Sequence, residues 1–261
     1  MAVLLLRLAA PLQAWGSSSK FIVRSTEREP TKSGVIGMIA AALGIQRNDD
    51  PQKLVPLTTL RFGVRADKEG VLLKDFHTVQ VPGEKHPEVS YRYYLSDAVF
   101  LVALGSDDKS LLESIASALQ KPVYPLYLGR KSCPPTLPIV LGVKDEDILT
   151  ALKTEPYLYK NAHRKSVRIS YEVTSGGAMV QDIPLSFSQL HRKHGWRRYC
   201  GNFIGKRRKG YKRSHNYYEK EFADGILIFK ADRYYCNYYK EIRFVRCFGK
   251  LNSGTKQFRA E

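Results

Sequence analysis

The chain has 261 residues, of which 43% are hydrophobic and 11% aromatic; this supplies a folded core and excludes a wholly disordered protein. No apolar run approaches the roughly 20 residues of a membrane-spanning helix, and Arg7 interrupts the apolar start of the chain. The net charge of +17 favours a polyanionic partner, either nucleic acid or an anionic membrane surface. Four cysteines without a recognisable export signal predict reduced thiols and a cytoplasmic protein.

The charge is distributed unevenly along the chain. Residues 190–261 carry 19 Lys or Arg residues against 6 Asp or Glu residues, together with 8 of the 16 tyrosines. Residues 1–189 carry 23 basic residues against 19 acidic ones. We therefore expect an ordinary globular body followed by a basic, tyrosine-rich segment that contacts a polyanion.

The first expected elements are a strand, a helix and a second strand. Residues 2–9 (AVLLLRLA) predict a buried strand. The run GVIGMIAAALGI at residues 34–45 is apolar on nearly all sides, so we expect a helix packed against a sheet, with Thr31 or Ser33 as its N-cap. The alternation at residues 57–64 (LTTLRFGV) predicts a half-exposed strand.

A polar excursion at residues 77–94 separates these elements from the next group, and connectors of that length are often functional. We then expect a strand, a helix capped by Asp108, and two short strands, at residues 97–104, 109–119, 123–128 and 138–143. The order is strand–helix–strand twice over, which is the ferredoxin-like arrangement of two split βαβ units. Beyond residue 145, short β-prone stretches such as 167–173 predict a second, smaller β region.

The segment PLQAWG at residues 11–16 follows the first strand and has two open interpretations. In one, it is a turn whose indole, Trp15, packs in the core. In the other, it is a single-stranded nucleic-acid site beside the permissive backbone of Gly16, in which Trp15 stacks on a base and the Gln13 amide reads a base edge.

Three further groups combine cations with aromatic residues or with a helix N-terminus, which is itself an anion-binding element. They are Arg24 with Arg28, Lys32 and Ser33, Arg92 with Tyr93 and Tyr94, and Arg130 and Lys131 next to Tyr127. Each group alone is compatible with an exposed basic surface. Together they favour RNA or single-stranded DNA as the partner, since stacking contributes about 1–3 kcal/mol per base and phosphate contacts add salt-dependent affinity.

The sequence lacks the familiar cofactor and metal motifs. It has no GxxxxGK[ST] loop and no CxxC pair, and the glycines of GVIG at residues 34–37 fall within the apolar helix. His191, His194 and Cys200 fit a basic surface better than a metal site. We therefore expect neither a metal nor a cofactor.

Six motifs resemble, in order, those of the Cas-five family of CRISPR RNA-binding proteins in its type I-E form. They are PLQAWG (11–16), PTKSG (30–34), AALGIQRND (41–49), DFHTV (75–79), YLSDA (94–98) and YLGRKSCP (127–134). They span residues 3–143, and a weaker match continues from residue 182 to Arg198.

The resemblance implies an α+β fold. Residues 1–145 would form a ferredoxin-like, RRM-like (RAMP) domain with a thumb hairpin inserted at residues 77–94. A small β-rich region at 146–198 would follow. Residues 199–261 form a basic extension that lies outside the family pattern.

The resemblance also implies a non-catalytic subunit of the type I-E Cascade complex in antiviral defence. It would bind the 5′ handle of the CRISPR RNA and cap the filament of backbone subunits (CasC). It would also dock the large subunit (CasA) for target DNA recognition. A membrane is not among the partners that the resemblance implies. The residues carried over to RNA binding are Gln13, Trp15, Gly16, Arg24, Lys32, Ser33, Arg92, Tyr93, Arg130 and Lys131. In and next to the extension, the expected nucleic-acid contacts are Arg197, Arg198, Lys206, Arg207, Arg208 and Lys209.

Two other functions remain open from the residues. A related branch of the family, in type I-C systems, cleaves precursor RNA without a metal, a reaction that needs a general base and a cation. Candidates for these roles include His77, His86, His163 and several Tyr and Lys residues, but no spacing singles them out. A stand-alone RNA-binding protein fits the charge but not the ordered motifs.

Overall fold

The computed structural model divides the chain into two compact units, Met1–Gly210 and Tyr211–Glu261. It describes residues 1–16, 23–80, 82–83, 86–162, 166–188 and 192–204 of the first unit. In the second unit it describes an antiparallel pair, β12 (Lys220–Ala223) and β13 (Ile226–Phe229).

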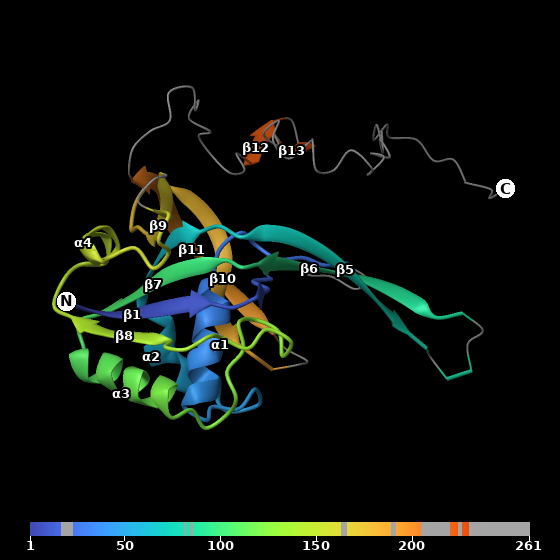
Figure 1. Ribbon diagram of the computed structural model, residues 1–261, viewed down its shortest axis with the longest axis horizontal. Helices are drawn as coiled ribbons and strands as arrows, with labels where there is room; N and C mark the ends of the chain where they lie inside the picture. The colour runs from blue at the N-terminus through green and yellow to red at the C-terminus, as the bar shows by residue number, and fades with distance from the viewer. Residues whose placement is uncertain are drawn as a thin grey trace. The chain divides into compact units, whose positions relative to one another are not determined.

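The first unit is built on a seven-stranded antiparallel sheet in the order β10-β11-β9-β4-β7-β1-β8 (Figure 1). The strands are β1 (Ala2–Ala9), β4 (Arg61–Lys68), β7 (Val99–Ser106), β8 (Val140–Lys144), β9 (Val167–Glu172), β10 (Ala178–Ser186) and β11 (Lys193–Ile204). The strands of the expected small β region therefore extend the main sheet, and β11 runs beyond Arg198.

Helices cover both faces of this sheet. Helices α1 (Lys32–Ala42) and α3 (Lys109–Gln120) share one core with alternate residues of β1 such as Leu4 and Leu6. On the other face, Val3 and its neighbours pack against α4 (Ile148–Thr154). This alternation follows from the two-residue period of a strand. No helix in the described part of the chain is long and apolar enough to cross a membrane.

A second, smaller sheet carries a long hairpin. Strand β5 (Val71–Val79) pairs antiparallel with β6 (Glu88–Ser96), and the hairpin projects from the body of the first unit (Figure 1). Short strands β2 (Leu12–Gln13) and β3 (Val23–Arg24) flank β6 near the body, β2 antiparallel and β3 parallel to it. The polar excursion expected at residues 77–94 thus comprises the end of β5, most of β6 and the residues between them.

Local sequence signals located several elements correctly. The first strand occupies Ala2–Ala9 as expected. The apolar helix begins at Lys32 because the Thr31 side chain caps it, accepting a hydrogen bond of 3.2 Å from the Gly34 amide. The Asp108 carboxylate caps α3 in the same way, at 3.1 Å from the Leu111 amide.

One expected strand begins later than predicted, and another does not form. Residues 57–64 begin within a short helix, α2 (Val55–Thr58), which follows the 3-10 turn η1 (Pro51–Leu54), and β4 starts only at Arg61. Residues 123–128 form no strand because the Val123 and Tyr124 amides bond to carbonyls at the end of α1. Helix α4, capped by Asp147, was not expected.

Candidate nucleic-acid interface

The base of the hairpin brings two arginines together from distant parts of the sequence. Strand β3 lies parallel to β6, with Val23 opposite Tyr91 and Arg24 opposite Arg92. Cross-strand partners on one face of a sheet are close neighbours, so these two guanidinium groups start from adjacent backbone positions. Tyr93 follows directly on β6.

The loop after Leu128 adds a third arginine. The Ala14 amide donates to the Leu128 carbonyl at 3.1 Å, and the Cys133 amide bonds back to the Arg130 carbonyl at 2.9 Å. Gly129 has φ +94°, and a Cβ there would lie 1.7 Å from the Ala14 carbonyl oxygen. Only glycine fits so close to β2, which explains the Gly-Arg order of the motif.

The guanidinium group of Arg130 is fixed by neutral partners. It donates to the Tyr93 carbonyl at 3.1 Å and to the Arg24 carbonyl at 2.8 Å, and it lies 4.6 Å from the centre of the Tyr94 ring. Carbonyl oxygens and an aromatic face orient the cation without neutralising it.

Arg24, Arg92 and Arg130 therefore form what we call the arginine cluster. Within the described residues, no carboxylate forms an ion pair with any of the three, and the buried Nε of Arg92 has no hydrogen-bond partner. The exposed side chain of Lys131 adjoins the cluster in sequence. Asp75, opposite Arg92 on β5, has its carboxylate 3.0 Å from His77, so three guanidinium groups without a described ion pair form a site suited to phosphate oxygens.

In the PLQAWG segment the indole of Trp15 packs in the core, as in the first of its two interpretations. The expected contacts of Gln13 and Trp15 with bases are therefore corrected. Trp15 is 1% exposed, and its indole donates to the Gln13 oxygen at 3.0 Å. The Gln13 amide donates to the Ala98 carbonyl at 2.8 Å. Both side chains are occupied inside the core and have no face left to stack on or read a base. Gly16, by contrast, is exposed.

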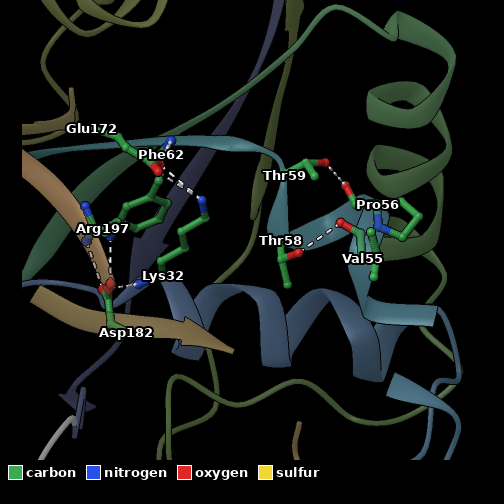
Figure 2. A network of polar contacts seen from close by, with 9 residues as sticks. All are labelled: Lys32, Val55, Pro56, Thr58, Thr59, Phe62, Glu172, Asp182 and Arg197. Carbon is green, nitrogen blue, oxygen red and sulfur yellow. Dashed lines mark hydrogen bonds and ion pairs between the residues drawn. The ribbon is translucent and has the colours of Figure 1, made fainter. Parts of the chain in front are cut away.

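Lys32 and Arg197 belong to a buried ionic network rather than to a phosphate-binding surface (Figure 2). The Lys32 ammonium lies 3.0 Å from Glu172, and Arg197 donates to Asp182 at 2.6 and 2.8 Å. Asp182 also accepts the backbone N–H of Lys32 at 2.9 Å. Their expected direct contacts with nucleic acid are corrected, because internal carboxylates hold both cations.

This ionic network ties the start of α1 to the outer strands of the sheet. Glu172 on β9 also accepts the backbone N–H of Phe62 at 3.2 Å, and Arg197 lies over the Phe62 ring (Figure 2). Burial lowers the pKa of Lys32, an effect that the charge of Glu172 opposes. Ser33 is buried beside Thr31, so a direct phosphate contact from its hydroxyl is corrected as well.

The remaining expected residues divide between exposed positions and residues outside the described part of the chain. Arg198 is exposed on β11. Lys206, Arg207, Arg208, Lys209 and His163 lie outside the described residues. Sequence reasoning grouped Tyr94 with Arg92 and Tyr93 but did not predict that its ring lies beneath the Arg130 guanidinium group. It also missed Glu172 and Asp182, which no local pattern connects to α1.

Comparisons with known proteins agree on one family. The family model described as "CRISPR-associated protein (Cas_Cas5)" matches residues 3–200. The CRISPR system Cascade subunit CasD of Escherichia coli (strain K12) is 40% identical over 157 residues, covering 53% of this chain and 70% of that protein.

Two solved structures are also similar. One, described as "Crystal structure of Cas protein", has a TM-score of 0.63 and 38% identity over 78% of this chain and 95% of its own. The other, a chain of a "CRISPR RNA-guided surveillance complex", has a TM-score of 0.64 and 33% identity over 77% of this chain and 89% of its own.

Proposed function

The chain belongs to the Cas5 family of CRISPR-associated proteins, and on that premise we propose that it is a subunit of a type I-E Cascade surveillance complex. In this role it binds the 5′ handle of the CRISPR RNA in antiviral defence. It acts by binding and not by catalysis. The complex is cytoplasmic.

We infer that the body of the first unit is a ferredoxin-like, RRM-like domain. The chain order β1, α1, β4, β7, α3, β8 and the sheet order β4-β7-β1-β8 support this assignment. The β5–β6 hairpin is inserted between the two halves of that pattern. We propose that it is the thumb, and that a small β-rich region at 146–198 and a basic extension at 199–261 follow the domain in the chain.

The arginine cluster is the observation that carries the RNA-binding proposal. Arg24, Arg92 and Arg130 converge at the thumb base from three separate segments, and Arg130 is held there without a carboxylate. Guanidinium groups bind phosphate oxygens through paired, charge-assisted hydrogen bonds. We assign the handle phosphates to this cluster and to Lys131, with Tyr93 and Gly16 at its border.

The buried members of the expected site act by positioning. Gln13 and Trp15 hold β2 against the core, and β2 in turn accepts the close approach of Gly129. Lys32 and Ser33 fix the start of α1. These residues therefore determine where the arginine cluster lies.

The proposed partners are the CRISPR RNA, the Cascade backbone subunit (CasC), the large subunit (CasA) and target DNA within the complex. The chain would cap the CasC filament beside the handle and dock CasA for target recognition. Relatives described as a Cascade subunit and as part of a surveillance complex support these partners.

Sequencing of the 5′ ends of RNA that copurifies with the tagged chain tests the proposal, after coexpression with the other Cascade subunits and a CRISPR array. We expect one shared leader derived from the repeat. The Arg24→Glu/Lys131→Glu double variant should retain roughly tenfold less of this RNA, since two phosphate contacts become repulsive. Lys121→Glu, at an exposed position beyond α3, should retain a normal amount. Equal RNA retention in all three proteins would contradict the proposal.

Precursor-RNA cleavage is the alternative function, and one observation favours it. His77 lies two residues from Asp75 on β5, with their side chains 3.0 Å apart, and Asp75 is opposite Arg92. A histidine beside a cation is the minimum for metal-independent cleavage. Incubation of the purified chain with a repeat-containing RNA in a chelator separates the two functions. Intact RNA is expected, and cleavage that His77→Ala abolishes would establish the alternative.

A further inference from the structure

An exposed tryptophan lies on β11, outside the arginine cluster. Trp196 is 51% exposed, although tryptophan is usually well buried, and Met179 on the neighbouring strand is 50% exposed. Trp196 lies opposite Gln181, and Arg198 lies opposite Met179. Residues two apart on a strand share a face, so these four side chains form one surface, here called the Trp196 surface.

This surface continues the face of the sheet that α4 covers farther in. On β11, Asn202 has the same parity as Trp196 and lies opposite Ile169, which packs in the α4 core. The buried ionic network of Arg197 and Asp182 lies on the opposite face. The Trp196 surface therefore lies beyond the core, at the outer edge of the sheet.

The charge around this surface has one sign. The exposed cation on the face of Trp196 is Arg198, two residues farther along β11; the exposed Lys193 has the opposite parity. Strands β10 and β11 contain a single carboxylate, Asp182, which is 1% exposed and neutralised by Arg197. The exposed side chains of these two strands thus present positive charge and an aromatic face without a described carboxylate among them.

We propose that the Trp196 surface binds a single-stranded nucleic acid, with Trp196 stacking on a base and Arg198 contacting a phosphate. A stacking aromatic beside cations is the arrangement by which proteins hold single strands without sequence preference. Trp, Met and Arg also occur at protein interfaces, and it is the net charge of +17 that favours a nucleic acid as the partner here. This site goes beyond the proposed handle-binding function, because it uses other strands and another sheet.

Intrinsic fluorescence of the full-length chain tests the proposal directly. The chain has two tryptophans, and Trp15 is buried, so quenching by added oligonucleotides reports on Trp196. Oligo(dT) and oligo(U) should each quench the emission, and the stronger of the two identifies the source as DNA or RNA. Iodide should quench more than caesium because of the surrounding positive charge. Absence of quenching by both oligonucleotides would overturn the proposal.

Variants separate stacking from general electrostatics. Trp196→Ala should weaken oligonucleotide binding about fivefold or more, and Trp196→Phe should retain most of the affinity. Arg198→Ala should reduce the salt dependence of binding by about one phosphate contact. Tyr124→Ala removes an aromatic side chain that is 40% exposed elsewhere and should change nothing.

Two comparisons keep this site distinct from others. The Arg24→Glu/Lys131→Glu variant should keep the Trp196 quenching even where it loses handle RNA, so the two proposals can fail separately. If Trp196→Ala leaves oligonucleotide binding unchanged and instead prevents copurification of another Cascade subunit, the surface is a protein interface and the proposal is wrong.

Discussion

The arginine cluster and the buried ionic network use the same kind of residue in opposite ways. In the network, each cation faces a carboxylate at 2.6–3.0 Å. In the cluster, Arg130 is oriented by backbone carbonyls and the Tyr94 ring. The first arrangement uses its charge to join α1 to the outer strands. The second keeps its charge for a ligand.

This difference shows why a count of cations does not locate a binding surface. Lys32 occurs in a family motif and lies at a helix N-terminus. These two features predicted a phosphate contact. Glu172, 140 residues farther along the chain, neutralises it. Whether a cation can bind a ligand depends on its partners in the tertiary structure. Each prediction below alters the contacts in the arginine cluster or in the buried ionic network.

The largest effect is expected for Asp182→Asn. The amide can still accept the Lys32 N–H, but Arg197 loses its counter-ion inside the protein. Removal of one partner of a buried ion pair costs about 3 kcal/mol or more of unfolding free energy. Urea unfolding followed by tryptophan emission measures the loss, since both tryptophans lie in the first unit.

The matched control for this network is Asp145→Asn. Asp145 pairs with Lys109 at 2.8 Å, but both side chains are largely exposed, so stability should change little. Equal destabilisation by the two variants would mean that the buried ionic network is no more important for stability than a surface pair.

Gly129→Ala acts on the other region, through the backbone. The new Cβ would meet the Ala14 carbonyl, and φ +94° is strained for alanine, so we expect a loss of about 2 kcal/mol. Arg130 should also shift, which lowers RNA retention together with stability. Gly83→Ala is the control: it has φ +91° but nothing within 4 Å of its Cβ, so it carries the conformational cost alone. If both variants retain RNA normally, close packing at Gly129 does not position Arg130.

The sequence predicted what is encoded locally. The caps Thr31 and Asp108 bond to amides three residues away, so short-range patterns found both helix starts. The strand expected over residues 57–64 begins only at Arg61, because the alternation spans a helix–strand junction and α2 ends at Thr58. A local sequence pattern does not determine whether a residue at such a junction belongs to the helix or to the strand.

The candidate site was predictable only in part for the same reason. Arg24, Arg92 and Arg130 were identified as cations near aromatic residues, and the fold brings them together. Burial of Trp15 depends on Gly34, where a Cβ would lie 2.8 Å from the indole, and this contact joins two separate motifs. Exposure of Trp196 depends on the position of β11 next to the edge strand β10. Neither contact partners nor sheet edges are visible in a single sequence.

The smallest expected effect is a pH dependence that distinguishes Lys32 from a surface lysine. Burial lowers the pKa of Lys32 below its ordinary 10.5, so between the lowered value and 10.5 the unfolded chain binds more protons than the folded one. The contribution of Lys32 to stability therefore rises with pH across that window. Unfolding free energies of the wild type and Lys32→Met, measured over a pH series, should diverge in favour of the wild type as pH approaches 10.5.

Lys144 provides a control of opposite sign. Its hydrogen bond with Glu155 raises its pKa, so its contribution is fully present below 10.5 and is lost as pH rises through the raised value. The difference between the wild type and Lys144→Met should shrink above pH 10.5, whereas that of Lys32→Met grows below pH 10.5 and is constant above it. If the wild-type-minus-variant differences in unfolding free energy change with pH in the same direction for Lys32 and Lys144, burial does not lower the pKa of Lys32. The proposed distinction between the buried ionic network and exposed cations would then be wrong for Lys32.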